Sequence, residues 1–300
     1  MHAFPLLAGA LALLAFPGPG STPPLRWGED GHQMAARAAI ETLPNGVPGF
    51  FTDAGEQLVY LDPEPDRWRV QPLREMDQAY SYDHYIDLEN VPAGVLDAPD
   101  RWVFLRRLHD SGMERPERDA GFLPFRIVEL YQRLVTEWRL WRAETDPLKR
   151  TWIEQRIVND AGVLGHYVTD AANPHHSTIH FNGWNSDAPN PEGYTTDREF
   201  HWRFESLFVR ARVRYGDVRP RVPAAARSVA GDVRAAVMAE IYESNGLVDT
   251  LYGLEKEIGF DPDGPFRAET RDFAADRLAA GAATLRDLWW SAWLESAEAP

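Results

Sequence analysis

Apolar residues recur every three or four positions along most of this chain, and this spacing restricts its fold more than any other feature. Such a period puts apolar side chains on one face of an α-helix, whereas a half-buried strand alternates every two residues. No alternating run of useful length, internal repeat or low-complexity linker occurs. We therefore predict an all-α fold with one multi-helix domain over residues 27–300. The periodic segments are 29–43, 123–144, 148–172, 197–215, 222–246 and 269–298, and Pro- and Gly-rich connectors lie at 44–49, 91–99, 187–193 and 261–265.

The first 26 residues differ from the rest of the chain. Residues 3–16 form one apolar run that is too short to cross a bilayer and lies where an export signal belongs. The run ends in the helix-breaking sequence PGPGS at 17–21. We interpret residues 1–26 as a signal peptide and short pro-segment, and expect a secreted or periplasmic protein with no transmembrane anchor. The alternative is a buried N-terminal helix.

The chain contains no cysteine, which excludes disulfides, thiolate metal sites and cysteine nucleophiles. Any metal ligands must therefore be histidines, carboxylates, backbone groups or water. The net charge of −15 repels polyanions, so a phosphate-rich substrate would need a local source of positive charge. Bound metal ions would supply such a source. Four of the tryptophans follow the helical spacing and are expected in the core: Trp138, Trp141, Trp289 and Trp293.

Two pairs of residues have the spacing of metal ligands on a helix. His166 and Asp170 are four residues apart, as are His201 and Glu205, so each pair projects from one helix face. A surface ion pair produces the same pattern. Both pairs, however, lie on strongly apolar helices, and burying four ionisable side chains is costly unless they are paired or bound to metal. The two pairs together favour a metal site.

Further candidate ligands occur in an order that resembles a known superfamily. Its members are the zinc-dependent phospholipases C and the single-strand-specific nucleases of the nuclease P-one type, and the resemblance extends from Trp27 to Glu205. It implies an all-helical, secreted phosphodiester hydrolase with three zinc ions, two at minimum. The matching residues are Trp27, His32, Asp66, His84, His166, Asp170, His176, His201 and Glu205.

The resemblance also implies how these residues divide among the ions. The first zinc would be held by Asp66, His84 and His166, and the second by His176, His201 and Glu205. The third would be held by Trp27 and His32, with Asp170 bridging the first and third ions. The family ligand lies six residues after the aspartate, which selects His176 over His175.

The same resemblance implies a catalytic and a substrate-binding set. Asp66, Asp170 and Arg69 would be catalytic, and Arg69 would also contact the substrate phosphate while Tyr85 and Asp87 contact the base. The implied reaction is attack of metal-activated hydroxide on phosphorus. RNA and single-stranded DNA are the expected substrates, and no stable protein partner is inferred. Phospholipase C activity is the alternative, and a noncatalytic zinc-binding secreted protein is the second alternative.

The sequence departs from the superfamily pattern in two ways. The family binds its third ion through the free amine of an N-terminal tryptophan, whereas Trp27 follows Arg26 rather than a typical cleavage site. The spacing is nuclease-like up to His201, but the ending His-x3-Glu is typical of the phospholipases. Among residues outside the pattern, we interpret Asp62 and Asp83 as ordinary acidic turn residues and His109 as a solvated helix residue. His175 and His180 are interpreted either as donors to ligands or as ordinary histidines.

Overall fold

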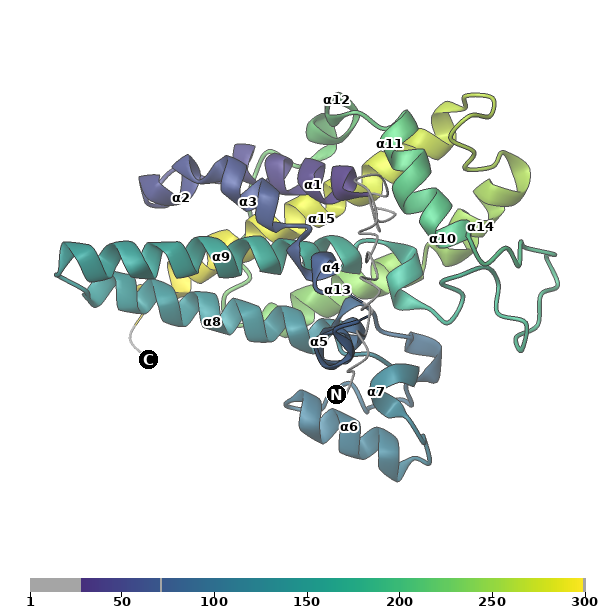
Figure 1. Cartoon of the computed structure of the whole chain (residues 1–300), viewed down its shortest axis with the longest axis horizontal. Helices are drawn as coiled ribbons and strands as arrows, with labels where there is room; N and C mark the ends of the chain where they lie inside the picture. The colour runs from purple at the N-terminus through teal and green to yellow at the C-terminus, as the bar shows by residue number, and fades with distance from the viewer. Residues whose placement is uncertain (1–27, 71, 299–300) are drawn as a thin grey trace, which may run out of the picture.

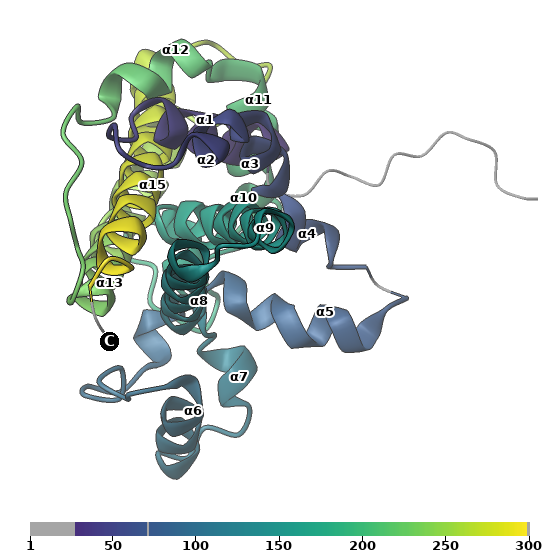
Figure 2. The same ribbon diagram turned by 90° about the vertical axis from the view of Figure 1, so that its left-hand side faces the viewer.

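A pair of long antiparallel helices forms the centre of the molecule. They are α8 (Leu123–Ala143) and α9 (Pro147–Ala171), which lie side by side in both views (Figures 1 and 2). The side chain of Asp146 caps α9 by accepting hydrogen bonds from the backbone nitrogens of Leu148 (2.9 Å) and Lys149 (3.3 Å). Pro147 occupies the first turn of α9, where its missing N–H costs nothing. The connection between the two helices is therefore short and specified locally.

The computed structural model describes residues 28–70 and 72–298, and these residues form an all-α fold, as predicted. The proposed signal peptide and pro-segment, residues 1–26, and the proposed ligand Trp27 lie outside the described residues. Helices α1 (Glu29–Glu41) and α15 (Ala268–Glu295) pack against each other and against α9. In the described part of the chain, no helix is both long and apolar enough to cross a membrane.

Shorter helices complete the fold around this frame. On one side of α9 lie α2 (Gly49–Asp53), α3 (Gly55–Leu61) and α4 (Glu64–Arg67). Figure 1 shows α6 and α7 below α8, and α10, α11 and α14 at the opposite end from the α8–α9 turn. The remaining elements are α5 (Arg74–Tyr80), η1 (Ser81–His84), η2 (Leu88–Asn90), α6 (Arg101–Asp110), α7 (Pro116–Asp119), η3 (Pro174–Ser177), α10 (Phe200–Trp202), η4 (Arg203–Phe208), α11 (Val209–Arg212), α12 (Tyr215–Val218), η5 (Arg219–Arg221), α13 (Val233–Asn245) and α14 (Val248–Glu257).

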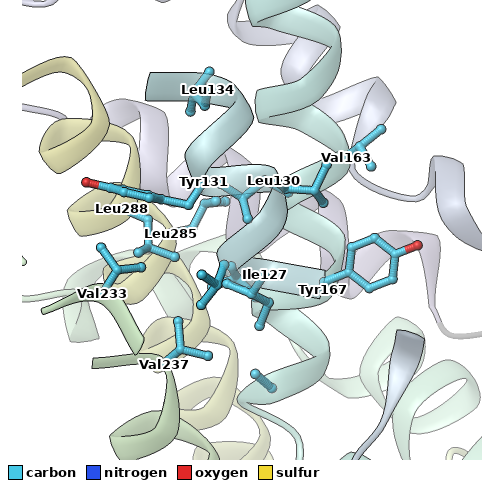
Figure 3. Close-up of a cluster of buried hydrophobic side chains, with 14 of the residues drawn as sticks. Ile127, Leu130, Tyr131, Leu134, Val163, Tyr167, Val233, Val237, Leu285 and Leu288 are labelled. Atoms are coloured by element: carbon cyan, nitrogen blue, oxygen red, sulfur yellow. The ribbon is translucent and has the colours of Figure 1, made fainter. Parts of the chain in front are cut away.

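The largest apolar core lies where α8, α9, α13 and α15 meet (Figure 3). Helix α8 contributes residues spaced three and four apart, as a buried helix face requires. Trp138 and Trp289 are almost fully buried, and Trp141 and Trp293 pack against the same cluster, so the predicted core role of these four tryptophans is confirmed. The core residues labelled in Figure 3 are Ile127, Leu130, Tyr131, Leu134, Val163, Tyr167, Val233, Val237, Leu285 and Leu288.

The first half of one expected helix is irregular. The segment 222–246 forms a helix from Val233 onwards, but residues 222–232 are irregular. This stretch runs against α15, whose side chains satisfy backbone groups that a helix would otherwise pair. Asp287 accepts a hydrogen bond from the backbone nitrogen of Arg227 (3.0 Å), and Ser291 accepts one from that of Val229 (2.7 Å). Tertiary contacts therefore replace the helix that the periodicity predicted.

Two glycines on α9 allow the chain around α3 to approach closely. A Cβ atom at Gly162 would lie 2.4 Å from the Cβ of Leu61, and one at Gly165 would lie 2.1 Å from Oδ2 of Asp62. Both separations are far below any real contact between such atoms. The missing side chains let the end of α3 lie directly on the buried C-terminal half of α9, and this places α1 and α4 near the candidate site.

Candidate metal centre

Histidines and carboxylates from seven elements converge at the C-terminal half of α9. Helix α9 supplies His166 and Asp170, both of which are almost completely buried. Only Asp66 and His201 among the described candidates retain moderate exposure, with 12% and 17% of their side chains accessible. The other contributions are His32 from α1, Asp66 from α4, His84 from η1, His176 from η3, His201 from α10 and Glu205 from η4.

These eight residues form three groups, each of which could hold a metal ion. Within each group, the potential ligand atoms lie within 4.8 Å of one another. The set contains the eight described members of the sequence-predicted ligand set, and Trp27 alone lies outside the described residues. Because His166 belongs to two of the groups, those two are contiguous. The groups are His32, His166 and Asp170; Asp66, His84 and His166; and His176, His201 and Glu205.

Asp170 connects two of these groups through its two carboxylate oxygens. Its Oδ2 lies 3.0 Å from Nδ1 of His84 and 3.3 Å from Nε2 of His166, whereas Oδ1 lies 3.6 Å from Nε2 of His32. Tetrahedral zinc with bonds of about 2.0–2.2 Å separates neighbouring ligand atoms by roughly 3.3–3.6 Å. The separations from His166 and His32 fall within this range and that from His84 is slightly shorter, so the two oxygens of Asp170 are placed to act as a bridging carboxylate.

The group of His176, His201 and Glu205 has its own fixed geometry. His176 Nδ1 donates a hydrogen bond to the carbonyl of His84 (2.6 Å), and a carbonyl can only accept. This bond leaves Nε2 of His176 as the deprotonated nitrogen, and it lies 3.6 Å from Oε2 of Glu205 and 3.2 Å from Nε2 of His201. Asn173 also donates a hydrogen bond to Oε2 of Glu205 (3.3 Å). These outer contacts orient the potential ligands toward one point.

Helix geometry contributes to the same group. His201 lies in α10, but Glu205 lies in a π-helical turn, η4, inserted between α10 and α11. Such turns widen the helix and often occur at functional sites. Oε2 of Glu205 lies 2.5 Å from Nε2 of His201, so the predicted four-residue pair does converge.

Burial makes this cluster unfavourable for charge unless cations are present. Desolvation lowers the pKa values of His32, His84 and His166 well below the ordinary value, and lowers that of His201 to about 3. The same burial raises the pKa of Asp170 well above its ordinary value and that of Glu205 to about 8. The histidines are thus neutral, which is the form in which an imidazole binds a metal. Among the described residues, Asp170 and Glu205 form close pairs with histidines but with no lysine or arginine, and metal ions would provide the compensating positive charge.

A large pocket opens beside the cluster. Its volume is about 610 Å³, and its walls carry two exposed aromatic residues, Phe181 (42% exposed) and Trp202 (38% exposed). Asp66, His84, Asp170, His176, His201 and Glu205 face this pocket. A bound molecule would therefore contact the candidate metal ligands and an aromatic wall together.

The three predicted substrate-binding residues also line this pocket. Arg69 Nη1 lies 3.6 Å from Oδ1 of Asp66, so the arginine is held at the edge of the cluster. The hydroxyl of Tyr85 donates a hydrogen bond to the carbonyl of Arg118 (2.6 Å). Asp87 is only 5% exposed, and its Oδ1 has no hydrogen-bond partner among the described residues. Sequence reasoning missed Phe181, Trp202 and Arg118 because lone aromatics and an arginine carry no pattern of their own.

Two interpretations of acidic residues as ordinary turn residues are wrong. Asp62 is completely buried, and its Oδ1 lies 2.8 Å from Nδ1 of His32. Asp83 is 2% exposed and accepts a hydrogen bond from Nη1 of Arg101 (2.8 Å), while Nε of Arg126 lies 3.5 Å away. These ion pairs anchor η1 and its candidate ligand His84 against α6 and α8. No local pattern revealed them, because their partners are distant in sequence.

The three other histidines in the described part of the chain lie in different surroundings. His109 is exposed on α6, as predicted. His175 is buried among Phe200, Phe204 and other rings, and neither of its ring nitrogens has a hydrogen-bond partner among the described residues. His180 is buried and stacks on Trp184, with ring centroids 3.7 Å apart. None of the three metal-ligand groups in the described part of the chain includes these residues.

The surroundings of Asp87 predict a pH-dependent cost in stability. Burial, with the nearby Glu89 and Asp119, raises the pKa of Asp87 to about 8. A raised pKa means that the folded state holds the proton more tightly, so the contribution of Asp87 to stability falls as pH rises from about 4 to 8. Asp87→Asn in metal-free protein is therefore expected to be about 1–3 kcal/mol more stable than wild type at pH 9. Urea unfolding at pH 4 and at pH 9 tests this, because the difference in stability between the variant and wild type should nearly vanish at pH 4. An equal difference at both would exclude titration of Asp87 as its cause.

No protein-family model, curated protein or solved structure matches this chain.

Proposed function

We propose that this protein is a secreted, zinc-dependent phosphodiester hydrolase that acts on single-stranded DNA and RNA. The main support is the arrangement of three ligand groups, two of which share His166, beside one large pocket that six of the eight candidate ligands line. Histidine and carboxylate ligands suit zinc, and the chain offers no thiolates for softer metals. Residues 1–26 would be removed on export. Trp27 remains a predicted ligand of the third ion, and its neighbour Gly28 is buried against the backbone of Glu205.

Charge supports an anionic substrate despite the acidic surface. Three divalent ions would exceed the charge of Asp66, Asp170 and Glu205 by about three units. That excess would be confined to the pocket, while the net charge of −15 would limit nonspecific binding of polyanions elsewhere. Arg69 would add a further positive group beside Asp66, placed to hold a nonbridging phosphate oxygen.

The chain's own residues would then orient and polarise the reaction. Zinc, when bound, supplies Lewis acidity that stabilises negative charge on phosphate oxygens and makes water a better nucleophile near neutral pH. Asp170 would keep two groups of ligands in register, and Asp66 would position Arg69. Because negative charge grows on phosphate oxygens in the transition state, fixed positive groups there lower the barrier rather than merely bind substrate.

The pocket wall favours nucleic acid over phospholipid. Exposed Phe181 and Trp202 offer flat surfaces on which a base can stack, and such stacking contributes about 1–3 kcal/mol per base. Oδ1 of Asp87, which has no hydrogen-bond partner in the described part of the chain, provides an acceptor at the same pocket. An acidic residue beside Tyr85 would also suit a choline group, so phospholipase C activity remains the second candidate.

An activity panel on zinc-loaded protein tests the proposal. Two to three zinc ions per chain are expected after dialysis, with hydrolysis of single-stranded DNA and RNA and little release of phosphocholine from phosphatidylcholine. Duplex DNA serves as the matched control substrate, because its bases are not free to stack on the wall. Release of phosphocholine alone would establish the second candidate. Zinc content with no turnover of any substrate would indicate a noncatalytic zinc-binding protein, and less than one zinc per folded chain would overturn the metal centre.

A further inference from the structure

A buried carboxylate outside the ligand set lies against one of the candidate ligands. Asp62 directly follows α3 as its C-cap residue and is 0% exposed, as is His32 on α1. Its Oδ1 lies 2.8 Å from Nδ1 of His32, and its Oδ2 has no hydrogen-bond partner among the described residues. No arginine or lysine is paired with it in the described part of the chain. Burial raises the pKa of Asp62 well above its ordinary value.

Burying the carboxylate of Asp62 costs folding free energy when no metal is bound. An ionised carboxylate that is buried without a cationic partner is strongly unfavourable. The chain nevertheless makes room for it, because a side chain at Gly165 would collide with Oδ2 of Asp62. A buried carboxylate that has space reserved for it, and whose one side-chain hydrogen bond among the described residues is to His32, calls for a role beyond packing.

The direction of the imidazole identifies that role. With Nδ1 of His32 facing Asp62, Nε2 is the nitrogen that faces the cluster, 3.6 Å from Oδ1 of Asp170. A proton on Nδ1, shared with the carboxylate, leaves the lone pair on Nε2 for a cation. Carboxylates that hold a histidine in this way fix its tautomer and increase its basicity toward metal.

We propose that Asp62 is a positioning residue that orients His32 as a metal ligand. It acts through His32 and contacts neither metal nor substrate. The proposal rests on the metal centre proposed above and extends it. The buried carboxylate of Asp62 is unfavourable in the metal-free fold, but it makes His32 a stronger metal ligand. Bound cations would also compensate the charge of Asp62 across the imidazole ring.

Asp62→Asn separates this role from ordinary packing. The amide has the same shape and can still accept a hydrogen bond from Nδ1 of His32, so the metal-free variant should unfold at a denaturant concentration equal to or above that of wild type. The affinity for the most weakly held zinc ion should fall about 10- to 100-fold, as measured by competition with a chromogenic chelator. Glu240→Gln is the matched control: Glu240 is another largely buried carboxylate, bonded to Thr284, and its variant should bind zinc as wild type does.

A double-mutant cycle provides a second measurement. In a His32→Ala background, Asp62→Asn should change zinc affinity by less than twofold, because its partner is gone. An effect of equal size with and without His32 would overturn the positioning role. So would a metal-free Asp62→Asn protein that is strongly destabilised but binds zinc normally. If wild type itself binds no zinc, the proposed function fails; if wild type binds zinc and Asp62→Asn binds it equally, only this inference fails.

Discussion

Asp170→Asn is expected to remove at least one zinc ion per chain and to lower kcat/KM by about 10³-fold. The reason is that both carboxylate oxygens face candidate ligands, so an amide in this place weakens two groups at once. A bound metal ion contributes several kcal/mol to the stabilisation of transition-state charge, and each 1.4 kcal/mol corresponds to a tenfold change in rate. Elemental analysis and steady-state kinetics on single-stranded DNA measure the two effects.

The same helix offers a control for this substitution. Asp160 is also a buried carboxylate on α9, but it pairs with Arg133 (2.7 Å) rather than with histidines. Asp160→Asn should change stability while zinc content and kcat/KM stay within about twofold of wild type. If Asp170→Asn keeps its full zinc content and loses less than tenfold in rate, Asp170 does not bridge ions.

Adding zinc to chelator-treated protein is expected to raise Tm by about 8–16 °C for each site filled at 1,000 times its Kd. The physical reason is that folding buries Asp170 and Glu205, which pair with histidines rather than with lysine or arginine in the described part of the chain, and metal supplies positive charge there. The metal-free protein should remain folded around the apolar core of α8, α9, α13 and α15, because that core does not depend on the ligands. Differential scanning calorimetry before and after zinc addition measures the shift.

The zinc effect should be larger at pH 8 than at pH 6. The pKa of Glu205 is raised to about 8, so the folded state holds its proton more tightly than the unfolded chain, and its contribution to stability falls as pH rises through this range. Deprotonation at the same time frees ligands for metal. Magnesium is the control ion, because it prefers oxygen ligands and should shift Tm little. A shift below 2 °C with zinc at both pH values would contradict a structural contribution of metal.

Much of the helical framework was predictable because its causes are local. The segments that became α1, α8, α9 and α15 carry apolar faces at helical spacing. Short helices such as α2, α4 and α7 have too few residues to show a period, so the sequence pattern missed them. Residues 222–232 were wrongly predicted to be helical. Their apolar spacing is that of a helix, but hydrogen bonds from their backbone to side chains of α15 hold them in an irregular conformation.

The residues of the candidate site were also predictable only where their causes are local. The pairs His166–Asp170 and His201–Glu205 could be recognised in the sequence because a spacing of four residues on one helix brings two side chains together. The order of the remaining histidines and aspartates suggested the other members of the set, but only through resemblance. Their convergence depends on α1, α4, η1 and η3 meeting at α9.

Helix periodicity and side-chain chemistry are local properties, so the order of amino acids is enough to predict the fold class, the core positions of the long helices and the residue types available to bind metal. The contacts between distant groups came instead from the packing of the folded chain. It placed Asp62 against His32, 30 residues away, and it buried Asp83 between Arg101 and Arg126. It also put the rings of Phe181 and Trp202 on the wall of the metal-ligand pocket. Such contacts depend on how helices pack in three dimensions, and no spacing along the chain encodes them.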